Sequence, residues 1–364
     1  MTERFNVRVM DQADDPEWDA FVAGVPSGHH VQTSLWGQVK TTLGYRTKRI
    51  IVCENGQIVA GGQLLIKRFN LFLTIGYMPK APVYLNGDPT LIEIIHDELK
   101  RVVKTDRINL LAVQPAHENT ELTKLYLSRG FRPSWLELAP TATILLDLTP
   151  YTGQILGQMK RQTRQNIHRS EREGITVREG KQADLPTFYR LHITTSQRQK
   201  FKPYSEEYFT KMWGIFSPHG YIRMILAEYA GETVSALLLV PFGDTVIAKT
   251  LGWSGQYGER RPNDAVFWAS IQWAKTHGYR YFDFEGIDRR GAEIMVSRQP
   301  LPEELQHSPD FMKLGFGGQV VLLPTSIEFI TNPLFRWLSR KVFGNTKRGP
   351  ALYDLFDRVR RRFG

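Results

Sequence analysis

The segment that decides the fold occurs twice: Phe311-Met312-Lys313-Leu314-Gly315-Phe316-Gly317-Gly318 in the second half of the chain, and Leu125-Tyr126-Leu127-Ser128-Arg129-Gly130-Phe131 in the first. Both copies predict a turn that leads into a strand. When the two Gly-Phe pairs are aligned, Lys313 lies opposite Ser128. One copy therefore carries an ammonium group where the other carries a neutral hydroxyl, which makes Lys313 a candidate for chemistry.

Matching elements in the same order support a duplication. Glu54 to Ala60 and Tyr229 to Ser235 each predict a hairpin around a glycine-containing turn. After each hairpin we expect an apolar strand, an amphipathic helix, a buried strand and the Gly-Phe segment. The expected apolar strands are 71–77 and 245–253, the helices 91–104 and 263–276, and the buried strands 108–113 and 279–286.

This order of elements resembles the acyltransferase-type α/β domains of N-acetyltransferases. The resemblance predicts an α/β (α+β) chain with two tandem GNAT-like domains, the acyl-CoA N-acyltransferase type. We expect the first domain over residues 1–150 and the second, with the catalytic segment, over 151–318. A strand from 319–330 is expected to return to the first domain.

Composition predicts a soluble, cytoplasmic globular protein. The 364 residues suffice for two cores, and the hydrophobic share of 41% is ordinary. No apolar run is long enough to cross a bilayer, and residues 1–10 lack the apolar stretch of a secretion signal. Cys53 is the single cysteine, so an intramolecular disulfide and a cysteine zinc cluster are excluded, and we interpret it as core packing.

A formal net charge of +10 indicates anionic partners. Part of this charge forms a stripe on a single helix expected over 154–173. Its members are Lys160, Arg164, His168 and Arg172, widened by Arg161 and Arg169. Two interpretations stay open: a solvated helix face, or a contact with tRNA or another phosphorylated partner through Lys160, Arg161 and Arg164.

Four segments resemble the Fem family of peptidoglycan-bridge aminoacyltransferases, in the family's order and over nearly the whole chain. They are Gln32-Thr33-Ser34-Leu35-Trp36-Gly37-Gln38-Val39-Lys40, Met159 to Ile167, Tyr281 to Ile287, and Phe311 to Gly318. The resemblance implies transfer of an amino acid from aminoacyl-tRNA to an amine of the stem peptide of a peptidoglycan precursor. That acceptor would be UDP-linked or lipid-linked.

Direct transfer suits the residues present. An aminoacyl ester is already activated, so a bound amine can attack it if the developing oxyanion is stabilised. The chain has no Gly-x-Ser-x-Gly elbow, and neither a covalent nucleophile, a cofactor nor a metal is expected. The resemblance assigns the oxyanion role to Lys313, although Met312 separates it from Phe311, its neighbour in the family motif.

For the acceptor, the resemblance assigns Lys40 to the diphosphate, with Trp36 one turn earlier as a packing residue of that site. The family's Arg-Ser-x-x-Tyr segment reads Tyr204-Ser205-Glu206-Glu207-Tyr208 here, so the arginine is missing. The further candidates for substrate binding are Arg198 and Lys202, which would replace its charge, together with Tyr208 and Phe311.

The identity of a general base is open. Several family members have Asp-Pro after the buried strand of the first domain, where this chain has Gln114-Pro115, and a neutral amide accepts no proton. Asp283 and Glu285 fall on one face of the strand expected over 279–286 and are the candidate catalytic carboxylates. Structural acids at a strand end are an equal interpretation.

The main alternative is an acyl-coenzyme A N-acyltransferase, because fold does not fix function. Such enzymes bind pyrophosphate through backbone N–H groups of a glycine-rich loop before the central helix. The two corresponding loops here contain Pro262 and Pro89, which have no N–H, and neither keeps the Gly-x-Gly pattern. A third possibility is a non-catalytic protein that binds tRNA or cell-wall precursors. The presence of Lys313, the candidate catalytic lysine, argues against it.

Residues 332–364 alternate apolar and basic side chains and predict two short amphipathic helices. Such helices could dock on the anionic inner surface of the cell membrane, where a lipid-linked acceptor resides, or pack on the body of the protein. No sustained heptad pattern predicts a helical arm, and we expect a monomer.

Overall fold

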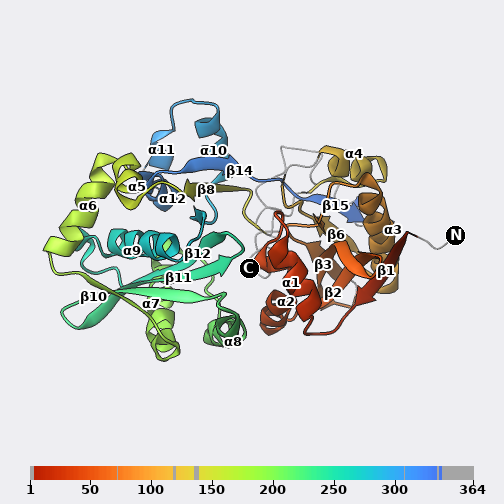
Figure 1. Ribbon diagram of the computed structural model, residues 1–364, viewed down its shortest axis with the longest axis horizontal. Coiled ribbons are helices and arrows are strands. Elements are labelled where there is room, and N and C mark those ends of the chain that lie inside the picture. The colour runs from red at the N-terminus through yellow and green to blue at the C-terminus, as the bar shows by residue number, and fades with distance from the viewer. Residues whose placement is uncertain are drawn as a thin grey trace. The chain divides into compact units, whose positions relative to one another are not determined.

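The computed structural model describes residues 4–71, 73–117, 120–134, 139–306, 308–333 and 336–337 (Figure 1). The chain divides into two compact units, Met1–Ala139 with Leu323–Gly364, and Pro140–Leu322. Each unit has a mixed sheet and an apolar core, which confirms the α/β prediction. No helix within the described ranges is long and apolar enough to span a bilayer. The amphipathic helices expected over 332–364 fall almost entirely outside these ranges.

The first unit is built on the strand order β1-β2-β3-β4-β6-β15-β7, with β5 paired to β3. The strands are β1 (Phe5–Met10), β2 (Arg46–Glu54), β3 (Gln57–Asn70), β4 (Leu73–Met78), β5 (Val83–Tyr84), β6 (Leu110–Val113), β7 (Arg132–Pro133) and β15 (Ile327–Ile330). The helices are α1 (Pro16–Gly24), α2 (Ser34–Lys40), α3 (Pro89–Thr105) and α4 (Thr120–Ser128). β15 follows the whole second unit in sequence, yet it lies between β6 and β7.

The second unit is built on the strand order β14-β8-β13-β12-β11-β10-β9. The strands are β8 (Ala142–Asp147), β9 (Thr176–Glu179), β10 (Arg223–Tyr229), β11 (Glu232–Phe242), β12 (Thr245–Trp253), β13 (Tyr281–Asp283) and β14 (Gln319–Leu322). The helices are α5 (Thr152–Gln158), α6 (Arg161–Arg172), α7 (Leu185–Gln199), α8 (Glu206–Phe216), α9 (Pro262–Thr276), α10 (Arg289–Val296), α11 (Glu303–Gln306) and α12 (Pro309–Lys313). β8 thus belongs to the second sheet, although the sequence analysis placed its residues in the first domain.

The duplication predicted from the sequence is present in the structure. Asn55 and Ala230 both have positive φ, 51° and 49°, directly before the turn glycine of their hairpins. β10 and β11 have a register shift at the position that corresponds to the shift between β2 and β3. In both units the strand after the central helix pairs in parallel with the third strand of the antiparallel series before it, as β6 with β4 and β13 with β12.

The prediction of a single helix over 154–173 is wrong, because two helices occupy this range. α5 ends at Gln158 and α6 begins at Arg161, with Met159 and Lys160 extended between them. Met159 is buried in the core, and the Lys160 N–H donates a hydrogen bond to the carbonyl oxygen of Gly315 at 2.9 Å. The break therefore ties the start of α6 to the segment that follows Lys313.

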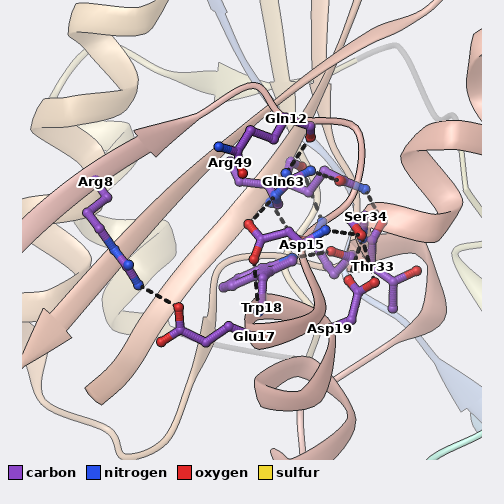
Figure 2. Close-up of polar contacts among 11 residues, drawn as sticks. Arg8, Gln12, Asp15, Glu17, Trp18, Asp19, Thr33, Ser34, Arg49 and Gln63 are labelled. Carbon is purple, nitrogen blue, oxygen red and sulfur yellow. Dashed lines mark hydrogen bonds and ion pairs between the residues drawn. The ribbon is translucent and has the colours of Figure 1, made fainter. Parts of the chain in front are cut away.

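A buried polar network holds α1 against the first sheet (Figure 2). Asp15 caps α1 by accepting from the Trp18 N–H, and it also accepts from Arg49 Nε of β2 at 3.0 Å. The Arg49 side chain is fully buried and donates further to Gln63 and to the carbonyl oxygen of Gln12. A charge with no access to water is thus paired and hydrogen-bonded from several sides.

The polar residues of the Gln-x-Ser segment anchor the start of α2. Gln32 accepts from the Gln63 N–H at 2.6 Å and donates to the carbonyl oxygen of Pro79. The Ser34 hydroxyl donates to Asp19 at 2.7 Å (Figure 2). This part of the motif is therefore structural, because it fixes the helix that ends at Lys40.

We expect Arg49→Met to lower the free energy of unfolding by about 3–5 kcal/mol, because the variant leaves the Asp15 carboxylate buried without its ion-pair partner. Urea titration measures this change. Arg46→Met on the same strand is the control: Arg46 is half exposed, so its ion pair with Asp106 should contribute less than about 1 kcal/mol. Equal stabilities of the two variants would contradict the structural role of Arg49.

Candidate functional site

Lys313 ends α12, and its ammonium group is held by a turn that follows β13. Nζ donates to the carbonyl oxygens of Glu285 at 3.0 Å and Gly286 at 2.8 Å, and lies 3.9 Å from the Asp310 carboxylate. The side chain is 19% exposed. Burial lowers the pKa of Lys313 below its ordinary value, while Asp310, Glu285 and Asp283 oppose this effect. Lys313 therefore lies at the end of a helix, whereas the sequence predicted that it lies in a turn leading into a strand.

The rest of the Lys-x-Gly-Phe motif fixes where Lys313 lies. A Cβ atom at Gly315 would come within 2.2 Å of Thr163 Oγ1 on α6, so a larger residue does not fit. Phe316 is fully buried and packs against the rings of Phe267 and Phe284. Glycine permits the close approach of α6, and phenylalanine anchors the segment in the core.

The sequence predicted that Asp283 and Glu285 lie on one face of a single strand. This prediction is wrong, because β13 ends at Asp283. Glu285 and Gly286 follow with φ of 38° and 67°, in the left-handed region. The Glu285 N–H donates to Asp283 Oδ1 at 2.8 Å, and the Thr143 hydroxyl donates to the same oxygen. The Asp283 carboxylate thus stabilises the turn that Lys313 contacts.

Lys249 of β12 belongs to the site and was missed by the sequence analysis. Its Nζ donates to Glu285 Oε1 at 2.5 Å, and both side chains are less than a fifth exposed. Burial lowers the pKa of Lys249, but the attraction of the Glu285 carboxylate outweighs this effect and leaves the pKa above its ordinary value. A lysine between Ala248 and Thr250, within an apolar strand, was the sequence signal that could have found it.

Tyr204 and Tyr208 lie next to this ion pair. Their rings stack with centroids 4.2 Å apart, and Ser205 caps α8 between them by accepting from the Tyr208 N–H. Burial raises the pKa of both phenols, and both interact electrostatically with Glu285. The Tyr-Ser-x-x-Tyr segment therefore forms an aromatic wall beside the charged groups.

The remaining predicted substrate-binding residues of the second unit are less closely grouped. The Arg198 guanidinium lies 4.3 Å from the centroid of the Trp253 ring at the end of β12, and burial lowers its pKa. Lys202 is exposed in the connection between α7 and α8. Phe311 lies on α12, but its side chain is outside the described part of the structure.

The basic stripe of α6 has two kinds of members. Lys160 and Arg161, at the start of the helix, are exposed. Arg164 instead donates to the carbonyl oxygens of Gly157 at 3.0 Å and of Met159. Lys160 and Arg161 present charge to solvent, whereas Arg164 stabilises the break between α5 and α6.

In the first unit, Lys40 ends α2 with its Nζ 5.0 Å from the centroid of the Trp36 ring and 5.9 Å from that of Tyr45. Trp36 is 4% exposed and packs edge-on against His30. Lys67 of β3, which the sequence analysis did not single out, lies 5.0 Å from the same Tyr45 ring. Two ammonium groups thus flank one aromatic ring, which suits the binding of an anionic group.

Comparison with known families accounts for both units. Residues 13–125 match the FemAB family, and residues 157–293 match the acetyltransferase (GNAT) domain. The first unit thus resembles the FemAB family, and the second resembles the GNAT domain. Its sequence is 25% identical over 229 residues to a lipid II:glycine glycyltransferase of Staphylococcus haemolyticus, and 24% identical over 227 residues to one of Staphylococcus epidermidis. These matches cover 60% and 59% of this chain and 55% of each relative, so the chain spans about half of their length.

Solved structures confirm the tandem GNAT-like fold. A FemX crystal structure superposes with a TM-score of 0.78 at 18% identity, over 91% of this chain and 99% of FemX. The structure of L-PGS from Bacillus licheniformis superposes with a TM-score of 0.57 at 15% identity, over 92% of this chain and 98% of L-PGS. A tandem GNAT protein from the clavulanic acid biosynthesis pathway superposes with a TM-score of 0.55 at 9% identity, over 90% of this chain and 99% of that protein. These likenesses concern the fold.

The start of α9, where a GNAT enzyme would hold the pyrophosphate of coenzyme A, is occupied here by the protein's own side chains. Arg261 is left-handed with φ of 61°, and Pro262 follows as the first helical residue. Asp264, in the first turn, is 5% exposed and accepts from Asn166 Nδ2 at 3.0 Å. Burial raises the pKa of Asp264. In the first unit, α3 likewise begins with a proline after an aspartate cap.

We therefore expect calorimetry with acetyl-coenzyme A to give no saturable heat, because each helix start carries an acidic side chain where the pyrophosphate would need N–H donors. Micromolar binding together with acetyl transfer to a small amine would contradict this expectation and make the coenzyme A reaction the leading one.

Proposed function

We propose that this protein is an aminoacyltransferase that moves an amino acid from aminoacyl-tRNA to an amine of a peptidoglycan precursor's stem peptide. The observation that carries the proposal is the ammonium group of Lys313, the lysine of the Lys-x-Gly-Phe motif in the second unit, which the carbonyl oxygens of Glu285 and Gly286 hold. The lipid II:glycine glycyltransferases it matches support the same class of reaction.

The reaction needs only a bound amine, the aminoacyl ester and a stabilised oxyanion. The amine nitrogen attacks the ester carbonyl carbon, a C–N bond forms, and the bond to the ribose oxygen breaks. The proton that the amine loses balances the one that the leaving ribose oxygen gains. Lys313 stabilises the oxyanion formed between these steps, a contribution of about 3–4 kcal/mol for one such donor.

The two candidate carboxylates take supporting roles in this proposal. Asp283 accepts hydrogen bonds from a backbone N–H and from Thr143, and Glu285 is paired with Lys249. Both groups hold the turn that contacts Lys313. The proton of the amine is then passed to the leaving oxygen within the bound substrates.

The charged groups of the first unit and of α6 suit the partners of this reaction. We propose that Lys40 and Lys67, whose ammonium groups lie near the Tyr45 ring, bind the diphosphate of a UDP-linked or lipid-linked precursor. The exposed Lys160 and Arg161 suit contacts with tRNA phosphates. Both substrates are available at the cytoplasmic side of the membrane, where we place the protein. Transfer assays with a set of charged tRNAs and both precursor types test the proposal.

Lys313→Ala should lower the single-turnover transfer rate by roughly two to three powers of ten, the usual result of losing one oxyanion donor. Binding of the precursor should be unchanged. Lys211→Ala, which alters an exposed lysine of α8, is the control and should keep the wild-type rate. A wild-type rate in Lys313→Ala would show that this lysine has no part in the chemistry.

Lys40→Ala should act on binding instead. A phosphate contact is made equally in the ground state and the transition state, so its loss raises the KM for the precursor and leaves kcat nearly unchanged. Steady-state kinetics with varied precursor separate the two constants. A fall in kcat at unchanged KM would remove Lys40 from the diphosphate site.

A further inference from the structure

Lys249 and Glu285 form a partly buried ion pair beside the turn that holds Lys313. The pair joins the middle of β12 to the turn after β13, and its two side chains are 19% and 18% exposed. Glu285 is also the residue whose own carbonyl oxygen accepts from Lys313. One residue thus contacts a lysine through its side chain and a second lysine through its backbone.

The conformation of Glu285 needs support. With φ of 38° it lies in the left-handed region, which residues with a Cβ atom rarely adopt. The Asp283 carboxylate holds its N–H, Lys313 holds its carbonyl oxygen, and Lys249 holds its carboxylate. The side-chain contact is the one that selects a carboxylate at this position.

We propose that Lys249 is a positioning residue for Lys313: by holding the Glu285 carboxylate, it fixes the left-handed turn whose two carbonyl oxygens hold the Lys313 ammonium. The catalytic meaning of this arrangement rests on the proposed function, but the arrangement itself can be tested without it. Lys249 should therefore affect the rate of transfer and not the binding of either substrate.

Several other titratable groups interact with Lys313 or with Glu285, and none of them is substituted in the variants tested. Asp310 lies on the same helix, and its carboxylate also accepts from the Asp288 N–H at the start of α10. Asp283 lies at the end of β13. From α8 and the residues before it, Tyr208 and Tyr204 interact with Glu285.

The first test measures how readily acetic anhydride labels Lys313 as a function of pH, by mass spectrometry of the full chain. Lys249→Met leaves the Glu285 charge uncompensated, so the pKa of Lys313 should rise and labelling should begin at higher pH. Glu285→Gln removes a negative charge, so labelling should begin at lower pH. The double variant has lost both charges and should lie close to wild type.

The second test is kinetic. Lys249→Met should lower kcat by between about tenfold and a hundredfold with KM unchanged, and Lys249→Arg should recover part of the loss, because it restores the ion pair. Lys211→Met is the control for removing a lysine from this unit. Thermal unfolding of every variant shows whether it is folded. If Lys249→Met fails to fold, Glu285→Gln and Lys249→Arg still test whether Lys249 positions Lys313.

Unchanged labelling of Lys313 in Lys249→Met and Glu285→Gln, or a wild-type kcat in Lys249→Met, would overturn the proposal. If the labelling shifts as expected while the wild-type protein transfers no amino acid from any charged tRNA, the positioning role stands and the proposed function fails.

Discussion

The close approach of α6 to the segment after Lys313 is the constraint on which the site depends. Thr163 lies where any side chain at position 315 would have to go, and the Lys160 N–H bonds to the carbonyl oxygen of that same glycine. Since Phe316 is buried in the core, the position of Lys313 follows from the packing of the whole unit. A cation placed in this way needs little reorganisation when charge develops beside it.

Lys249 and Lys313, two partly buried lysines of the second unit, differ in how their charge is balanced. Lys249 faces a carboxylate at 2.5 Å, so its field is largely cancelled. Lys313 is held by two neutral carbonyl oxygens, and its Nζ lies 3.9 Å from the Asp310 carboxylate. Dipoles solvate an ammonium group without neutralising it, so a nearby anion still experiences its charge. The first unit places a buried charge differently, because Arg49 serves to hold α1 on its sheet.

The sequence predicts the parts of this fold that follow from local pattern. The hairpins at Asn55 and Ala230, the central helices and the buried strands that follow these helices were all expected from turn residues and apolar periodicity. The break at Met159 was not, because it is made by a hydrogen bond to Gly315, far away in the sequence. Lys249 was missed for a similar reason, since its partner Glu285 lies beyond a strand that ends earlier than its apolar pattern suggests.

The insertion of β15 into the first sheet makes the order of synthesis matter. The ribosome releases β6 and β7 well before β15, with the whole second unit in between. Until β15 arrives, the edge of β6 has unpaired backbone groups, and Arg132 lacks the buried Glu328 carboxylate it pairs with at 2.7 Å. The nascent first unit therefore lacks the strand between β6 and β7 until the whole second unit has been made, and β15 can join its sheet only after that.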